Sequence, residues 1–141
     1  MSSPTFPSAI EISCGPVTAV DLALYAAASG DLNPLHLDDG VARKAGFDQP
    51  LVHGMLTMAY VARLFTQTFG SGALLALNTR FIGAAKRGDT LVLSARLGAC
   101  DDNSALYHVR GTTGAGSEVV SGSARVRLGQ ASPATAAQIT P

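Results

Sequence analysis

The hydrophobic and polar positions divide the chain into a helical first half and a strand-rich second half. Thr18 and Asp21 form a capping-box pattern ahead of an apolar run, which predicts a helix that ends at Gly30. A turn is expected next, because Pro34 does not allow the helix to continue. A second, short helix is expected over residues 38–45.

Residues 54–69 carry the clearest helical signal. They place apolar side chains on almost every face of a helix, and Arg63 is their only charge. A helix that is apolar nearly all round is normally buried. At about 1.5 Å per residue it would run roughly 20 Å or slightly more, the width of a small domain. We therefore expect this helix to run through the centre of the fold.

Beyond Gly72 the pattern changes to short alternating or β-branched runs that are typical of strands. Four such runs are separated by turn-forming sequences, and they cover residues 75–82, 90–97, 105–112 and 119–128. Short loops between consecutive strands predict an antiparallel meander. Helices followed by four strands, with one helix buried, give an α+β fold in which the sheet wraps around that helix.

Size and composition fit one compact domain. The chain has 141 residues, which predicts a single domain over 1–141. We expect an ordered core over about 10–129, a loose arm in the proline-rich first dozen or so residues, and a flexible tail over 130–141. Hydrophobic residues make up 47% and charged residues 14%, so part of the surface is expected to be buried in an oligomer.

Charge and the remaining composition exclude several classes of protein. Ten basic residues balance ten acidic ones, which argues against a nucleic-acid-binding protein, because such a protein needs a basic surface. No apolar run reaches the roughly 18 uncharged residues of a membrane span, and the N-terminus lacks a secretory signal pattern. Cys14 and Cys100 have neither metal-site nor redox spacing, so we expect buried, reduced thiols and a cytoplasmic protein.

Candidate chemistry centres on Asp31 and His36. They are five residues apart across a proline-containing turn, which is short enough to bring a carboxylate and an imidazole into one small space. Adding water to an activated alkene needs such a pair. One group takes a proton from water, and the other orients the water and returns a proton to the neighbouring carbon. Histidine suits the base role because it changes charge near neutral pH.

A second candidate feature, His53 followed by Gly54, stands at the predicted start of the central helix. The first backbone N–H groups of a helix have no intrahelical partner, and the helix dipole favours an anion there. Glycine allows a ligand to approach the backbone closely. This position therefore suits the negative charge that develops on a thioester oxygen during water addition.

Plainer interpretations of the same residues stay open. Asp31 and Asn33 suit hydrogen-bonded turns, and His36 suits a loop position with satisfied ring nitrogens. A metal site is disfavoured, because Leu35 falls where a calcium loop needs a ligand and too few His or Cys residues lie nearby for zinc. His108 lies in a predicted strand and is expected to be structural. The residues alone thus predict an acid/base pair beside a helix N-terminus.

Longer motifs carry a family resemblance. Residues 30–36 have the sequence Gly-Asp-x-Asn-Pro-x-His, which closely resembles the signature of the MaoC-like (R)-specific enoyl-CoA hydratases. Residues 51–56, Leu-Val-His-Gly-Met-Leu, resemble the family's second motif, and Phe81 with residues 87–89 resembles its third. The mycobacterial 3-hydroxyacyl-acyl-carrier-protein dehydratase subunits are similar as well.

This resemblance implies the hot-dog fold, in which a curved antiparallel sheet wraps around a long central helix. It implies that Asp31 and His36 hold and activate water, that Asn33 supports the loop, and that the Gly54 amide binds the thioester oxygen. It also implies a dimer with sheets joined edge to edge, an acyl tunnel near the interface, and no metal or organic cofactor. The candidate catalytic residues are Asp31, His36 and Gly54, and the candidate substrate-binding residues are Ser29, Asn33, His53 and Met55.

The expected function is therefore (R)-specific interconversion of trans-2-enoyl and (R)-3-hydroxyacyl thioesters of CoA or acyl carrier protein, by a homodimer or a heterodimer. Two alternatives are kept: a non-catalytic or partner-dependent subunit of a heterodimeric dehydratase, and an acyl-thioester hydrolase. The chain departs from the family pattern at Ala28 and in the Gly-Ala-Ala sequence over 83–85. Neither departure touches Asp31 or His36, so they bear on the expected substrate preference more than on the expected reaction.

Overall fold

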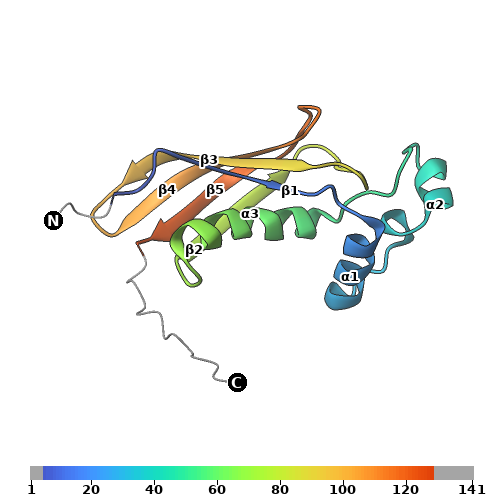
Figure 1. The fold of residues 1–141 in the computed structure, drawn as a ribbon, viewed down its shortest axis with the longest axis horizontal. Helices are drawn as coiled ribbons and strands as arrows, with labels where there is room; N and C mark the ends of the chain where they lie inside the picture. The colour runs from blue at the N-terminus through green and yellow to red at the C-terminus, as the bar shows by residue number, and fades with distance from the viewer. Residues whose placement is uncertain (1–4, 129–141) are drawn as a thin grey trace, which may run out of the picture.

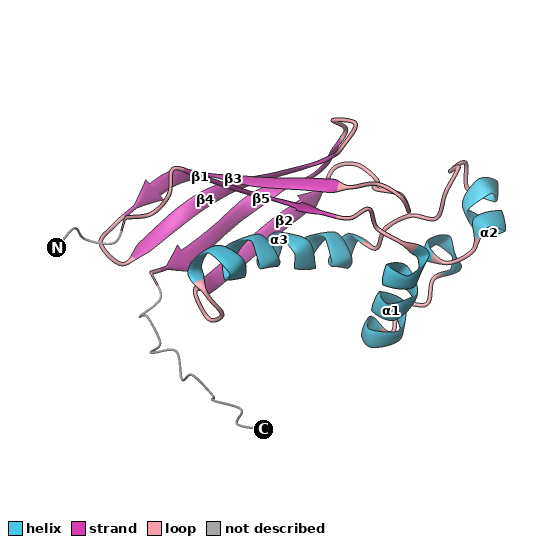
Figure 2. Ribbon diagram, in the orientation of Figure 1, coloured by secondary structure: helices cyan, strands magenta, loops and turns pink. Residues whose placement is uncertain are grey.

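The computed structural model describes residues 5–128, which form one antiparallel sheet, a helix across its face and a group of short helices at one end (Figure 1). In chain order the elements are β1 (Ala9–Cys14), α1 (Ala19–Ser29), the 3-10 helix η1 (Pro34–His36), α2 (Asp39–Lys44), α3 (Gly54–Phe69), β2 (Leu74–Phe81), β3 (Leu91–Cys100), β4 (Ser104–Thr113) and β5 (Glu118–Arg127). Figure 2 shows α3 running along the sheet, with α1 and α2 beyond the end of α3 where that helix begins. None of the helices in residues 5–128 is long and apolar enough to span a membrane.

Helix α1 begins and ends where the sequence predicts. The Asp21 backbone N–H donates to Thr18 Oγ1 at 3.1 Å, and the Thr18 backbone N–H donates to Asp21 Oδ2 at 2.8 Å, which completes the capping box. Gly30 ends the helix with φ 78°, a left-handed conformation that glycine adopts without steric cost. Because these signals are local, the helix leads directly into the turn that carries Asp31.

Helix α3 has the predicted bounds, but it is buried on one side only. Leu64 and Phe65 are fully buried against the sheet, where Phe65 packs edge-on against Tyr107 of β4. Met55, by contrast, is 56% exposed, and Arg63 is exposed as well. The prediction of an all-round buried helix was therefore wrong for one face, because the single sheet covers only the opposite face.

The first strand corrects the expected loose arm. Residues 9–14 pair antiparallel with β3, from Ala9 opposite Arg96 to Cys14 opposite Leu91. Ile10 and Ile12 pack against the core on alternate positions, which is the two-residue period of a strand. The prolines flank this run rather than interrupt it, so they do not prevent pairing. The predicted tail over 130–141 lies outside the described residues.

The sheet has the order β1-β3-β4-β5-β2, which differs from a simple meander. Strands β3, β4 and β5 follow one another as predicted, but β2 pairs with β5 instead of β3. The connection over residues 82–90 is longer than the two to five residues of a hairpin loop. It can therefore lead from the edge strand β2 past β5 and β4 to β3. Gly122 allows the close β2–β5 pairing, because a Cβ there would lie 2.0 Å from the Asn78 carbonyl oxygen.

Candidate active site

Hydrogen bonds within the loop after α1 hold its conformation. The Ser29 hydroxyl donates to the Tyr25 carbonyl oxygen at 2.7 Å and accepts from the Asp31 backbone N–H at 3.2 Å. The Asn33 N–H donates to Asp31 Oδ1 at 3.3 Å, and the Leu35 N–H donates to Asn33 Oδ1 at 3.0 Å. These are the turn contacts that the plainer interpretation expected. They use only one of the two carboxylate oxygens of Asp31, so that interpretation does not exclude a chemical role.

The second carboxylate oxygen of Asp31 faces His36. Asp31 Oδ2 lies 3.7 Å from His36 Nε2, and the side chains are 50% and 14% exposed. The other ring nitrogen, His36 Nδ1, lies 2.8 Å from the Leu51 carbonyl oxygen. A carbonyl oxygen only accepts hydrogen bonds, so this contact places the proton of a neutral His36 on Nδ1 and leaves a lone pair on Nε2. At 3.7 Å the two groups are too far apart for a direct hydrogen bond, and a water molecule placed to one side could hydrogen-bond to both.

His53 is the third side chain of this cluster and is 1% exposed. Its Nε2 lies 3.1 Å from the Asp31 carbonyl oxygen. Its ring stacks on the His36 ring with centroids 3.9 Å apart and planes 23° from parallel, and the Tyr25 ring packs edge-on at 4.9 Å. Burial lowers the pKa of His53 below its ordinary 6.5, opposed by the hydrogen bond to the Asp31 carbonyl oxygen. His53 is therefore held in the neutral form near neutral pH.

Asp31, His36 and His53 each place one possible metal-ligand atom within 4.8 Å of the others. The lone pairs of an imidazole lie in the plane of its ring, so two stacked rings cannot both direct one at a single ion. Asp31 and one imidazole then remain, which is fewer than the three protein ligands of typical zinc sites. The arrangement favours acid/base chemistry over metal binding.

Gly54 is the first residue of α3, next to this cluster. The backbone N–H groups of Leu56 and Thr57 both donate to the His53 carbonyl oxygen at 3.1 Å, whereas the Gly54 N–H has no hydrogen-bond partner within residues 5–128. A Cβ at Gly54 would lie 3.3 Å from the ring of Phe81, so the ring lies close against this backbone. The helix start thus presents a free donor beside an aromatic side chain.

A cavity of about 260 Å³ joins His36 to the start of α3. Its lining is mostly apolar and comprises His36, Leu51, Val52, Gly54, Thr57, Phe81, Gly83, Ala84, Ala85 and Val119. Of the candidate residues, His36 and Gly54 line the cavity. Asp31 does not line it, but its carboxylate faces His36. Ser29 and Asn33 contact the loop instead, His53 is buried behind His36, and Met55 is exposed on α3.

Sequence reasoning missed several residues of the cavity wall. Thr57 lies three residues after Gly54, and helical periodicity alone places it near the same face. Phe81 was singled out as part of a motif but not as a wall of the site. Residues 83–85 were linked to substrate preference through the family resemblance, but were not placed in a wall. Val119 has no local signal, because only the pairing of β2 with β5 brings it to this segment.

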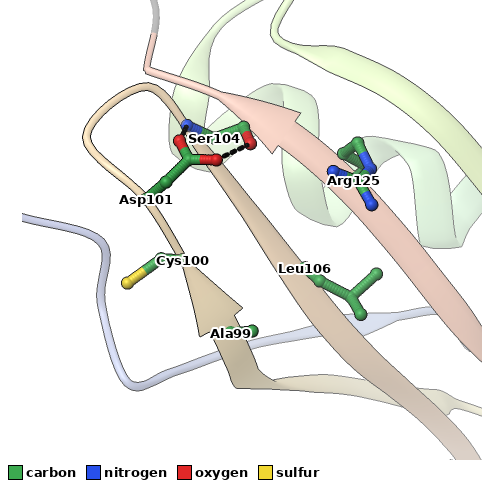
Figure 3. Close-up of a pocket in the computed structure, with 6 residues that line it drawn as sticks. All are labelled: Ala99, Cys100, Asp101, Ser104, Leu106 and Arg125. Carbon is green, nitrogen blue, oxygen red and sulfur yellow. Dashed lines mark hydrogen bonds between the residues drawn. The ribbon is translucent and has the colours of Figure 1, made fainter.

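A second cavity, of about 210 Å³, lies near the turn between β3 and β4 and is shown in Figure 3. The carboxylate of Asp101 accepts hydrogen bonds there from the backbone and the hydroxyl of Ser104, so it serves the turn. Cys100 is exposed there, which corrects the prediction of two buried thiols, whereas Cys14 is buried as predicted. This cavity has no pair of groups suited to proton transfer.

The chain is similar to known proteins of one family. Residues 8–119 match the family described as the MaoC like domain. The chain is 38% identical over 72 residues to the mitochondrial 3-hydroxyacyl-acyl-carrier-protein dehydratase of Arabidopsis thaliana, covering 51% of this chain and 43% of that protein. It is 42% identical over 57 residues to the (R)-specific enoyl-CoA hydratase of Aeromonas caviae, covering 40% of this chain and 42% of that protein. The matched segments therefore span less than half the length of these curated relatives.

Solved structures extend the likeness over most of the described chain. The (R)-hydratase from A. caviae superposes with a TM-score of 0.78 at 31% identity, covering 92% of this chain and 100% of that chain. An unliganded R-hydratase from Pseudomonas aeruginosa superposes with a TM-score of 0.78 at 29% identity, covering 86% of this chain and 80% of that chain. These likenesses confirm the expected α+β fold class, an antiparallel sheet with a central helix.

Proposed function

Because the chain belongs to the MaoC-like domain family and has its hot-dog fold, we propose that it interconverts trans-2-enoyl and (R)-3-hydroxyacyl thioesters by adding or removing water. The main support is that Asp31 Oδ2 lies 3.7 Å from His36 Nε2, and that His36 lines a mostly apolar cavity that extends to Gly54. The names of the curated relatives and of the superposed hydratases support the reaction class.

The proposed hydration uses the two facing groups in distinct roles. Asp31 orients a water molecule, and His36 Nε2 accepts one of its protons while the water oxygen forms a bond to C3 of the enoyl group. The electrons of the C2–C3 double bond move onto the thioester carbonyl. The imidazolium then returns a proton to C2, which restores His36 and completes the 3-hydroxyacyl product. His36 thus acts as both base and acid, whereas the sequence-based expectation divided these two tasks between the two groups. Dehydration follows the same steps in reverse.

The Gly54 amide is proposed to stabilise the charge that develops on the thioester oxygen. Its N–H lies at the positive end of the α3 dipole and has no protein partner within the described chain. A preorganised donor of this kind typically contributes on the order of 10² to 10³ in rate. The mostly apolar wall that runs past Thr57 and Phe81 suits the carbon chain of an acyl group.

The partner and the compartment belong to the same proposal. We propose a homodimer joined at the edge strand β2, where Leu75 is 49% and Phe81 47% exposed, with a heterodimer as the alternative. The proposed thioester carriers are CoA and acyl carrier protein, since curated relatives are named for both. A cytoplasmic location stays a proposal, because curated relatives include mitochondrial and peroxisomal enzymes.

Product analysis tests the reaction class directly. Purified protein is incubated with trans-2-enoyl-CoA of short, medium and long chain, and the products are separated by chiral chromatography while free thiol is measured in parallel. We expect (R)-3-hydroxyacyl-CoA and no thiol release. Release of CoA thiol without a hydroxyacyl product would instead identify an acyl-thioester hydrolase, and turnover only after a partner subunit is added would favour the heterodimer.

A further inference from the structure

His53 contacts both members of the acid/base pair without lining the cavity. Its Nε2 lies 3.1 Å from the backbone carbonyl oxygen of Asp31, and its ring stacks on His36 at 3.9 Å. It is 1% exposed, and the cavity wall does not include it. A substrate therefore has no path to the His53 ring, and a role in binding or proton transfer to substrate does not fit its position.

The two stacked histidines have opposite protonation patterns. Both rings direct one nitrogen at a carbonyl oxygen, which accepts but cannot donate. His53 therefore carries its proton on Nε2, towards Asp31, whereas His36 carries its proton on Nδ1, towards Leu51. His36 Nε2 is thereby left as the free lone pair that faces the carboxylate. The stacking distance allows neither ring to turn over without displacing the other.

The remaining atom of the His53 ring supports a neutral, fixed imidazole. Nδ1 is buried and has no hydrogen-bond partner within residues 5–128. A second proton on this atom would place an unsatisfied donor and a charge in a buried position, next to the His36 ring. The Tyr25 ring packs edge-on against His53 from another element, which holds the imidazole in place from a second direction.

We propose that His53 is a positioning residue, whose stacking on His36 and hydrogen bond to the Asp31 carbonyl together set the gap between the two proposed catalytic groups. The catalytic part of this inference rests on the proposed hydratase function. Because His53 also precedes Gly54 in the chain, it links the acid/base pair to the proposed oxyanion donor. A misplacement of about 1 Å in such a constellation can cost on the order of 10²-fold in rate.

Two substitutions separate the contributions of the hydrogen bond and the ring. His53→Gln keeps an N–H donor within reach of Asp31 but loses the stacking surface, and His53→Phe keeps a ring but loses the donor. His108→Gln is the matched control, because it removes an exposed imidazole on β4, away from the site. We expect kcat to fall by roughly 10- to 100-fold in both His53 variants while KM changes by less than about twofold, and the control to match the wild type. Unchanged kcat in both variants would overturn the positioning role.

Imidazole nitrogen NMR provides a readout that does not depend on activity. The chain has three histidines, so the ring signals can be assigned from the variants and the control. At a pH of about 8 we expect the wild type to show a proton on Nε2 of His53 and on Nδ1 of His36. Because the Leu51 carbonyl oxygen sets the His36 tautomer, we expect folded His53→Gln to keep that tautomer, with shifted His36 ring signals from the loss of the stacked ring. A wild-type spectrum with either tautomer reversed contradicts the inference even where no variant folds. An inactive wild-type protein with the expected tautomers would instead count against the hydratase function alone.

Discussion

Asp31 makes a different contact with each of its three oxygen atoms. Oδ1 accepts from the Asn33 N–H within the loop, Oδ2 faces His36 across 3.7 Å, and the backbone oxygen accepts from His53. The turn and the chemistry therefore depend on different atoms of the same residue. An asparagine at position 31 retains an oxygen acceptor for the loop but loses the negative charge, so it separates the structural contribution of Asp31 from its chemical one.

The buried imidazole of His53 is expected to make folding stability depend on pH. Burial lowers the pKa of His53 in the folded state below the ordinary 6.5, so the unfolded chain takes up a proton first as the pH falls. Above 6.5 the residue is neutral in both states and contributes no pH dependence. As the pH falls from about 6.5 towards the lowered pKa, the free energy of unfolding should decrease.

Urea denaturation of the wild type and His53→Gln between about pH 8 and pH 5 measures this effect. His36 and His108 are present in both proteins, so the difference between the two curves reports on His53 together with its contacts with His36 and Asp31. The lowered carboxyl pKa values of Asp21, Asp39, Asp48 and Asp101 start from an ordinary 3.8, which lies below this range. The wild type should lose more stability than the variant as the pH falls. Parallel curves would show that burial does not keep His53 neutral.

At the scale of elements, the capping box of α1 is expected to stabilise the protein without affecting its chemistry. Thr18→Ala removes the acceptor for the Asp21 N–H and should lower the free energy of unfolding by about 1 kcal/mol. Thr18→Ser, which keeps the hydroxyl, is the matched control and should stay close to the wild type. Chemical denaturation measures the difference, and kcat should be unchanged in both, since the cap lies at the opposite end of α1 from Asp31. A large loss of kcat in Thr18→Ala would show that the whole helix positions the loop.

The elements that the sequence predicts well are those with local signals. α1 and α3 begin and end where a cap, a glycine or the limit of an apolar run indicates, because each signal lies within a few residues of the boundary it sets. Strand partners have no such signal. The pairing of β1 with β3 and of β2 with β5 depends on segments far apart in sequence, so the meander was only partly correct.

The residues of the site also differ in whether a local signal or a long-range contact places them. Asp31 and His36 share one turn, and their proximity follows from that turn. The stacking of His53 on His36 depends on how the start of α3 packs against η1, and the wall formed by Phe81 and Val119 depends on the sheet order. Residue type and spacing therefore identify the chemical groups, whereas the cavity needs the tertiary structure.

In the whole molecule, the site lies where the short helices meet the sheet and the start of α3 (Figure 1). Two ion pairs join the β2–β3 connection to the segment that follows η1. Lys86 Nζ lies 2.6 Å from Asp48 Oδ1, and Arg87 Nη2 lies 2.6 Å from Asp39 Oδ1. The Val52 N–H also donates to the Ala85 carbonyl oxygen at 2.8 Å. These contacts hold together the segments that form opposite walls of the cavity.

The central claim is that Asp31 and His36 together add water to an enoyl thioester. The most direct measurement is the initial rate at which conjugated-enoyl absorbance is lost from trans-2-butenoyl-CoA, for the wild type, Asp31→Asn and His36→Ala, with folding checked by circular dichroism. We expect rapid loss with the wild type and a fall of about 10²- to 10⁴-fold in each folded variant, since Asp31 orients the water from which His36 takes the proton. Wild-type rates in both variants would contradict the account.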